Sequence, residues 1–173
     1  MPTLMRKLIL FIATSLDGYI AGPDGEIDWL FSDQDYGYSA FYSTIDTVVM
    51  GRKTYDVSLS FAEYPYPGKQ AFVFSRTRAG ERDDHATFVS GDIPGFVRTL
   101  KSQPGRRIWL IGGGAIIRPL LQDDLIDEFR IFVHPIVLGA GIPLFPLPLS
   151  MKTLHFRECH AFDTGLVRLT YER

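Results

Sequence analysis

Residues 7–14 (KLILFIAT) form an almost unbroken apolar run near the start of the chain. A strand that faces water on one side alternates apolar and polar residues, whereas a strand buried on both faces is apolar throughout. The run therefore predicts a central strand of a sheet that is covered on both sides. Such a sheet needs helices between its strands, which favours the α/β class.

The remainder of the chain alternates between strand and helix patterns. Residues 15–29 hold three glycines and a proline and are expected to form a loop. The last two strands should form an antiparallel hairpin with Val167, Leu169 and Tyr171 on one buried face. We expect a mainly parallel sheet of about eight strands. The expected strands are 7–14, 47–50, 70–75, 87–89, 107–111, 129–137, 154–162 and 166–171. The expected helix faces are Tyr38, Phe41, Tyr42 and Ile45, then residues 52–59, then Ile93, Phe96, Val97 and Leu100 after the cap Asp92, then Ile116, Ile117, Leu120 and Leu121.

Composition excludes several classes of protein. The 173 residues fit a single domain, 1–173, and the net charge of −2 gives no basic excess for nucleic acid. No apolar run reaches the 18 residues that indicate a membrane helix, and the single Cys159 excludes an internal disulfide. Strand alternation is expected to put His155 and Cys159 on one face and His160 on the other, so no metal site is predicted. A cytoplasmic protein is the default expectation.

Glycine, basic and hydroxyl residues follow three of the predicted strands. The carboxyl ends of parallel strands lie along one edge of a sheet, where helix N-termini and glycine turns offer N–H groups to phosphates. Their joint placement predicts a long anionic ligand, such as a dinucleotide, across this edge. The residues are Gly51, Arg52, Lys53 and Thr54, then Ser75, Arg76 and Thr77, then Gly112, Gly113, Gly114 and Ala115.

Each of these loops also has a plainer interpretation. The first could be an ordinary helix N-terminus, the second a polar turn, and the third a strand-to-helix turn that needs room. The first is not a P-loop, because Asp46 stands where that motif has its first glycine, and the third lacks the dinucleotide fingerprint, because Ile117 replaces its last glycine. Ser75, Arg76 and Thr77 would suit the 2′-phosphate that distinguishes NADP from NAD.

Five segments of the chain occur in the order of a known superfamily. They are SLDGYIA at 15–21 with Gly25 and Trp29, VMGRKTY at 49–55, VFSRT at 73–77, LIGGGA at 110–115, and residues 127–145. The set resembles the dihydrofolate reductase-like superfamily. It is most similar to the reductase domain of the bifunctional deaminase-reductases of riboflavin biosynthesis and to its stand-alone relatives. The resemblance implies a three-layer dihydrofolate reductase-like sandwich that uses NADPH as its hydride donor.

The resemblance also implies roles for the strand-end residues. Gly51 to Thr54 would hold the pyrophosphate, and Ser75 to Thr77 would lie near the 2′-phosphate. The turn from Gly112 to Ala115, with Ile111 before it, would pack on the diphosphate and the nicotinamide ribose. Ala13 and Ile20 would border the nicotinamide, and Ser15 and Trp29 are predicted substrate contacts.

The reaction is predicted from the same resemblance. The riboflavin-pathway domain reduces 5-amino-6-(5-phosphoribosylamino)uracil, and its SLDG segment matches residues 15–18. Asp17 is the candidate catalytic residue, with a turn-capping role before Gly18 as the alternative. Dihydrofolate reduction is a second possibility, although Asp28 rather than proline precedes Trp29. A third is a protein that binds or senses NADPH without turnover. The apolar stretch 142–149 (IPLFPLPL) predicts a homodimer.

Overall fold

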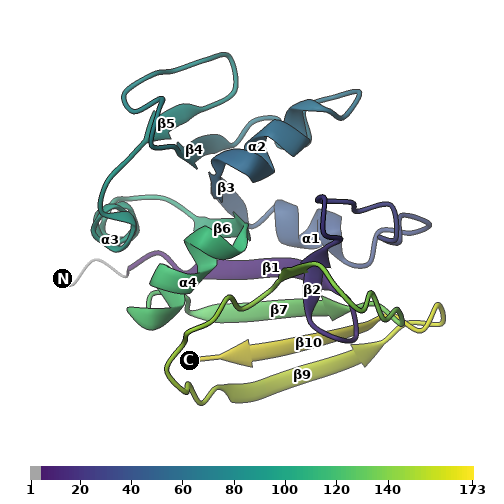
Figure 1. Ribbon diagram of the computed structural model, residues 1–173. Helices are drawn as coiled ribbons and strands as arrows, with labels where there is room; N and C mark the ends of the chain where they lie inside the picture. The colour runs from purple at the N-terminus through teal and green to yellow at the C-terminus, as the bar shows by residue number, and fades with distance from the viewer. Residues whose placement is uncertain (1–4) are drawn as a thin grey trace.

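The main sheet has eight strands in the order β5-β4-β3-β6-β1-β7-β10-β9 (Figure 1). The computed structural model describes residues 5–173, so residues 1–4 of the predicted domain lie outside it. The first six strands of this order run parallel to one another, whereas β10 is antiparallel to both β7 and β9. This arrangement confirms the predicted sheet. The strands are β1 (Leu8–Thr14), β3 (Ile45–Gly51), β4 (Gln70–Phe74), β5 (Thr87–Val89), β6 (Arg107–Gly112), β7 (Glu128–Val133), β9 (His155–Ala161) and β10 (Val167–Glu172).

Helices cover both faces of the sheet, as the apolar run in β1 requires. Leu8, Ile9 and Leu10 have no exposed surface. One face packs against α3 (Ile93–Ser102) and α4 (Gly114–Gln122), and the other packs against α1 (Tyr38–Tyr42) and α2 (Arg52–Leu59). This confirms the three-layer sandwich. The longest helix within residues 5–173 has ten residues, so no helix of this part is long and apolar enough to cross a membrane.

Two elements end several residues earlier than predicted, each for a local reason. The helix predicted to include Ile45 stops at Tyr42, where the Thr44 N–H bonds to the Phe41 carbonyl, and Ile45 starts β3 instead. The strand predicted to reach residue 137 stops at Val133. Pro135 follows and has no N–H to continue the ladder.

The C-terminal hairpin is less buried than its sequence pattern indicates. Leu169 is only partly buried, Thr170 is the buried residue of β10, and all seven residues of β9 are exposed. A bulge beside Thr170 shifts the register, so that His155 pairs with Glu172 and Cys159 with Leu169. The prediction that His155 and Cys159 share a face is therefore wrong. Alternation fails here because a bulge adds one residue to β9.

The segment predicted to be only a loop contributes one strand to a second, two-stranded sheet. Strand β2 (Tyr19–Ala21) pairs with β8 (Ile142–Pro143), which brings the apolar stretch 142–149 across to the first loop (Figure 1). Within that stretch Leu144 is buried, whereas Leu147 is 82% exposed. The stretch is thus partly absorbed by the core, and the homodimer stays a prediction.

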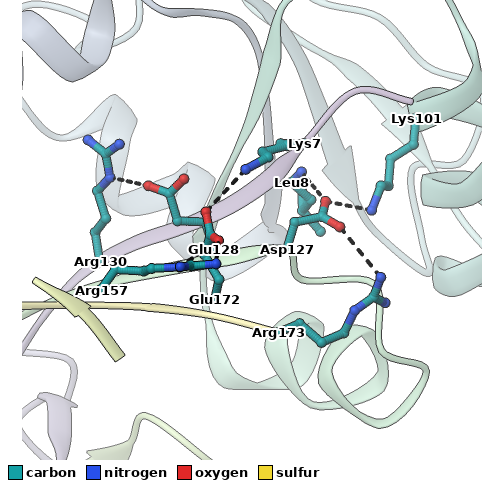
Figure 2. A network of polar contacts seen from close by, with 9 residues as sticks. All are labelled: Lys7, Leu8, Lys101, Asp127, Glu128, Arg130, Arg157, Glu172 and Arg173. Atoms are coloured by element: carbon teal, nitrogen blue, oxygen red, sulfur yellow. Dashed lines mark hydrogen bonds and ion pairs between the residues drawn. The ribbon is translucent and has the colours of Figure 1, made fainter. Parts of the chain in front are cut away.

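Charged side chains are concentrated at the amino ends of β1 and β7. Asp127 accepts the Leu8 N–H at 2.7 Å and pairs with the buried Lys101 ammonium at 2.6 Å, while Glu172 accepts from Lys7 and Arg157 (Figure 2). These contacts join the start of β1, the end of β10 and α3 to one another. They lie at the amino ends of these strands, at the edge opposite to the carboxyl edge where the predicted ligand-binding loops lie.

Candidate functional site

The three loops predicted to bind phosphates lie side by side at the carboxyl edge of the main sheet. Strand β3 is flanked by β6 on one side and β4 on the other. The register pairs Met50 with Gly112 and Gly51 with Phe74, so the three strands end at the same level. Residues 51–54, 75–77 and 112–115 therefore follow one another along this edge.

Two glycine turns adjoin at the centre of this edge. A Cβ on Gly51 would lie 3.2 Å from Ile116 Cγ1 and 3.8 Å from the Gly113 backbone nitrogen, so the start of α2 faces the first turn of α4. Gly112 has a φ of +132°, which L side chains rarely adopt. Here the chain requires glycine both for backbone conformation and for close approach.

Neither of these two helices caps its own N-terminus. Gly51 is the N-cap of α2 and Gly113 is the N-cap of α4, and neither helix has a side-chain cap hydrogen bond. The first N–H groups of a helix have no partner within it, and the helix dipole adds a partial positive charge. The edge thus presents two adjoining sets of backbone N–H donors, from which a phosphate could accept hydrogen bonds.

The helix that follows β5 is built differently. Asp92 is the N-cap of α3, as predicted, and its carboxylate accepts the Gly95 N–H at 3.0 Å. This aspartate supplies the partner that the other two helices lack. It also places a negative charge where an anion would have to bind.

The basic residues of the three loops differ in availability. Arg52 Nε donates to Asp56 Oδ1 at 2.7 Å, so this guanidinium is paired within α2. Lys53 and Arg76 are exposed, and within residues 5–173 neither takes part in an ion pair. Ser75 is buried, and its hydroxyl accepts the Thr77 and Arg78 N–H groups at 3.4 and 3.3 Å. Lys53 and Arg76 are thus the free cations of this edge.

The other residues predicted in the third loop have mixed surroundings. Ala115 is exposed, and Ile111 packs partly against the core beneath α2. A Cβ on Gly114 would lie 2.5 Å from Pro146 Cγ, so this glycine makes room for the 142–149 stretch. This close packing agrees with the plainer interpretation of the loop as a turn that needs room, and the cofactor contact predicted for Gly114 stays a prediction.

An aromatic cavity of about 460 Å³ opens beside the carboxyl ends of β1 and β7. Two strands contribute its floor and the segment before and within α1 contributes its wall. Tyr36 and Tyr38 of this segment line it. The lining residues are Phe11, Ala13, Leu30, Phe31, Ser32, Gln34, Asp35, Tyr36, Tyr38, Phe132, His134 and Leu166. The shape and composition suit a planar ring.

His134 holds one wall of this cavity in place. Its Nε2 accepts the Phe31 N–H at 3.2 Å and its Nδ1 lies 3.2 Å from the Phe132 carbonyl, an arrangement that fits a neutral ring with the proton on Nδ1. The rings of Trp29 and Phe31 meet it edge-on. Burial lowers the pKa of His134 and keeps the imidazole neutral. Sequence reasoning did not predict this residue as part of a site. The signal available was a histidine directly after a buried strand.

Asp17 and Ser15 form a turn. Ser15 donates to Asp17 Oδ1 at 2.6 Å, and the same carboxylate accepts the Leu138 and Gly139 N–H groups at 3.1 and 2.8 Å. The Ser15 hydroxyl, and next the backbone of 138–139, lower the pKa of Asp17. The carboxylate therefore joins the first loop to the 138–139 turn and stays ionised. Neither residue lines the cavity.

The remaining predicted contacts lie around the cavity. Ala13 lines the cavity. Trp29 does not line it but packs against His134, which does. Ile20 is partly buried against the core beneath α3 and α4. The site roles predicted for these three residues stay predictions.

Comparison with known proteins identifies the family. The model of the RibD C-terminal domain matches residues 6–168. YwjB of Bacillus subtilis strain 168, which is uncharacterized, is 45% identical over 97% of this chain and 98% of its own. The chain therefore belongs to the RibD C-terminal domain family.

Two solved structures share the fold. A candidate riboflavin biosynthesis protein from Shewanella sp. PV-4 has a TM-score of 0.86 at 35% identity, covering 96% of this chain and 98% of its own. Dihydrofolate reductase from Enterococcus faecalis, solved in complex with NADP(H) and RAB-propyl, has a TM-score of 0.73 at 15% identity, covering 96% of each chain. The second likeness confirms the dihydrofolate reductase-like fold.

Proposed function

We propose that this member of the RibD C-terminal domain family is an NADPH-dependent reductase of a small nitrogen heterocycle. The observation that carries the proposal is the pair of adjoining helix N-termini, capped only by Gly51 and Gly113, next to an aromatic cavity. The donors suit the phosphates of a dinucleotide and the cavity suits a ring. Family membership and the NADP(H) complex of a protein with the same fold support this assignment.

The edge residues fit NADPH. The backbone N–H groups that follow Gly51 and Gly113 would donate to the pyrophosphate, because no capping side chain competes for them. Arg76, with Ser75 and Thr77 beside it, would select the 2′-phosphate. Lys53 adds a second unpaired charge. When bound, NADPH supplies a hydride to the acceptor.

The cavity residues would orient the acceptor against the cofactor. Hydride transfer needs little from a protein beyond holding donor and acceptor in contact and keeping water away. Phe11 and Phe132 provide an apolar floor, and Ala13 leaves room at the end of β1 for the reacting rings. Neutral His134 keeps the wall formed by Phe31 in place.

Asp17 is better suited to positioning than to proton donation. It is ionised, and three donors occupy its two oxygens. It joins the first loop to the 138–139 turn at the carboxyl end of the sheet. Its substitution by asparagine should loosen that contact and raise KM more than it lowers kcat.

NADPH oxidation assayed side by side with a ribosylaminopyrimidine phosphate, its unphosphorylated form and dihydrofolate tests the proposal. Oxidation with any of the three supports a reductase, and the preferred compound separates the riboflavin-type substrate from folate. Binding of NADPH without oxidation by any acceptor would instead favour the sensing protein. No binding of NADPH would contradict the cofactor assignment.

A further inference from the structure

We infer that the acceptor taken by the aromatic cavity is a planar ring that carries no phosphate. The inference rests on the proposed function and narrows its substrate class. It departs from the phosphoribosylated pyrimidine that the riboflavin-pathway resemblance implies. Three observations carry it: the lining of the cavity, the pairing of the nearest cations, and a carboxylate on the wall.

The lining of the cavity includes no lysine or arginine. Six of its twelve residues are apolar, two are tyrosines, and the others are Ser32, Gln34, Asp35 and His134. His134 is neutral, since its Nε2 accepts a backbone N–H. Enclosed phosphates are held by arginine, lysine or groups of backbone donors, because their charge is costly to remove from water. Nothing along this lining supplies a positive charge.

The nearest cations on the same sheet face are already paired. Arg130 and Arg168 share that face with Phe132, a floor residue of the cavity. Arg130 pairs with Glu128, and Arg168 Nη2 lies 2.9 Å from Glu158 Oε2. The buried Arg168 Nε has no hydrogen-bond partner in the described part of the chain, and a Cβ on Gly37 would lie 3.5 Å from Arg168 Nη1. Glu128 and Glu158 thus pair with the two guanidinium groups, and neither arginine lines the cavity.

Asp35 adds a negative charge to the wall. Its carboxylate accepts from the Ser39 hydroxyl at 2.6 Å and from the Ser39 N–H at 3.1 Å. The Ser39 hydroxyl, and next its N–H, lower the pKa of Asp35, so the group is ionised at neutral pH. A phosphate would be repelled here, whereas ring N–H or amino groups would be attracted.

The cofactor edge shows the opposite arrangement. Lys53 and Arg76 are exposed cations without an ion pair in the described part of the chain, and the uncapped N-termini of α2 and α4 lie at the same edge. Phosphate recognition is thus concentrated at the edge, where the dinucleotide binds, and is missing from the cavity.

A matched pair of ligands tests this separation. We would titrate the full chain with 5-amino-6-ribosylaminouracil and with its 5′-phosphate, following binding by calorimetry with and without NADPH. We expect the unphosphorylated compound to bind at least about 10-fold more tightly. Equal or tighter binding of the phosphate, or binding of neither compound, would overturn the inference.

A charge introduced at the wall makes the test sharper. Gln34→Lys should bring binding of the 5′-phosphate to within about 3-fold of the unphosphorylated compound, whereas the matched Gln34→Met should leave the preference in place. If both variants change the preference equally, charge is not the cause and the inference fails. Failure of the proposed function would give a different result. The chain would still prefer the unphosphorylated compound, but no acceptor would support NADPH oxidation.

Discussion

Three helices of this protein begin at the carboxyl edge of a parallel sheet, but their first turns are completed in two different ways. Helices α2 and α4 have glycine N-caps and no side-chain cap hydrogen bond, whereas the N-cap of α3 is Asp92, whose side chain caps the helix. An N-cap aspartate in place of alanine is worth about 1 kcal/mol of stability. Two adjoining helices lack that contribution, so their first N–H groups have no capping side chain.

Nothing in the local packing forbids a side chain at one of these glycines. A Cβ on Gly113 would lie 3.6 Å from Thr54 Oγ1, an ordinary contact, and its φ of −86° suits any residue. At Asp92 the same kind of position holds a carboxylate that accepts the Gly95 N–H. The N-cap position thus carries no side chain in α4 and a carboxylate in α3, and single substitutions can exchange this difference.

The largest effect is expected when α4 is given the cap of α3. Gly113→Asp should take the free N–H groups and set a negative charge against the cofactor phosphates. We expect NADPH affinity to fall about 100-fold, equal to about 2.7 kcal/mol. The dissociation constant is measured by calorimetry and the melting temperature by circular dichroism.

Gly113→Ala is the matched control for this substitution. It adds the same Cβ but no carboxylate, so it should keep most of the affinity. If Gly113→Asp binds NADPH as the parent chain does, the uncapped N-terminus of α4 is not a phosphate site. If alanine weakens binding as much as aspartate, the Cβ rather than the charge is responsible.

A smaller effect is expected from the free cations. Arg76→Ala should weaken NADPH about 10-fold and leave NADH almost unchanged, because only NADPH carries the 2′-phosphate. Arg52→Ala is the control, since Arg52 is paired with Asp56 and should contribute less. Titrations with both cofactors measure the two effects. Equal losses for NADPH and NADH would remove Arg76 from the 2′-phosphate site.

The capped helix should respond in stability and not in binding. Asp92→Ala should lower the free energy of unfolding by about 1 kcal/mol, because the Gly95 N–H loses its partner. NADPH affinity should not change. Urea unfolding and calorimetry report the two quantities separately. A weaker cofactor affinity in this variant would mean that α3 shares in the phosphate site, which would end the contrast between the helices.

His134, like Asp92, is a polar group that the protein itself satisfies, and its effect should be the smallest. Its pKa is lowered by burial, so the unfolded chain binds a proton more readily than the folded one. Stability is therefore retained above about pH 6.5 and falls as the pH drops below it, by at most about 1 kcal/mol down to pH 5.5. His134→Gln should remove that dependence. If the pH profile of urea unfolding is unchanged in this variant, His134 is not the source of the pH dependence.

Sequence patterns predicted the regular parts of this molecule well. The apolar run of β1, the cap at Asp92 and the buried face of α4 were read correctly, because local spacing determines them. The bulge beside Thr170 was missed, since it depends on how two strands pair. The contact of Gly114 with Pro146, 32 positions along the chain, could not be predicted because it depends on how the 142–149 stretch folds back. His134 was missed because its contacts with Phe31 and Trp29 exist only in the folded chain.

The central claim is that the Gly51 and Gly113 helix N-termini bind the phosphates of NADPH. Calorimetric titration of the unmodified chain with NADPH, and then with NADH, tests it most directly. The account predicts saturable binding of one NADPH per chain, with a Kd of about 10 µM or below and an NADH affinity about 10-fold weaker. No detectable heat at about 1 mM NADPH would contradict it.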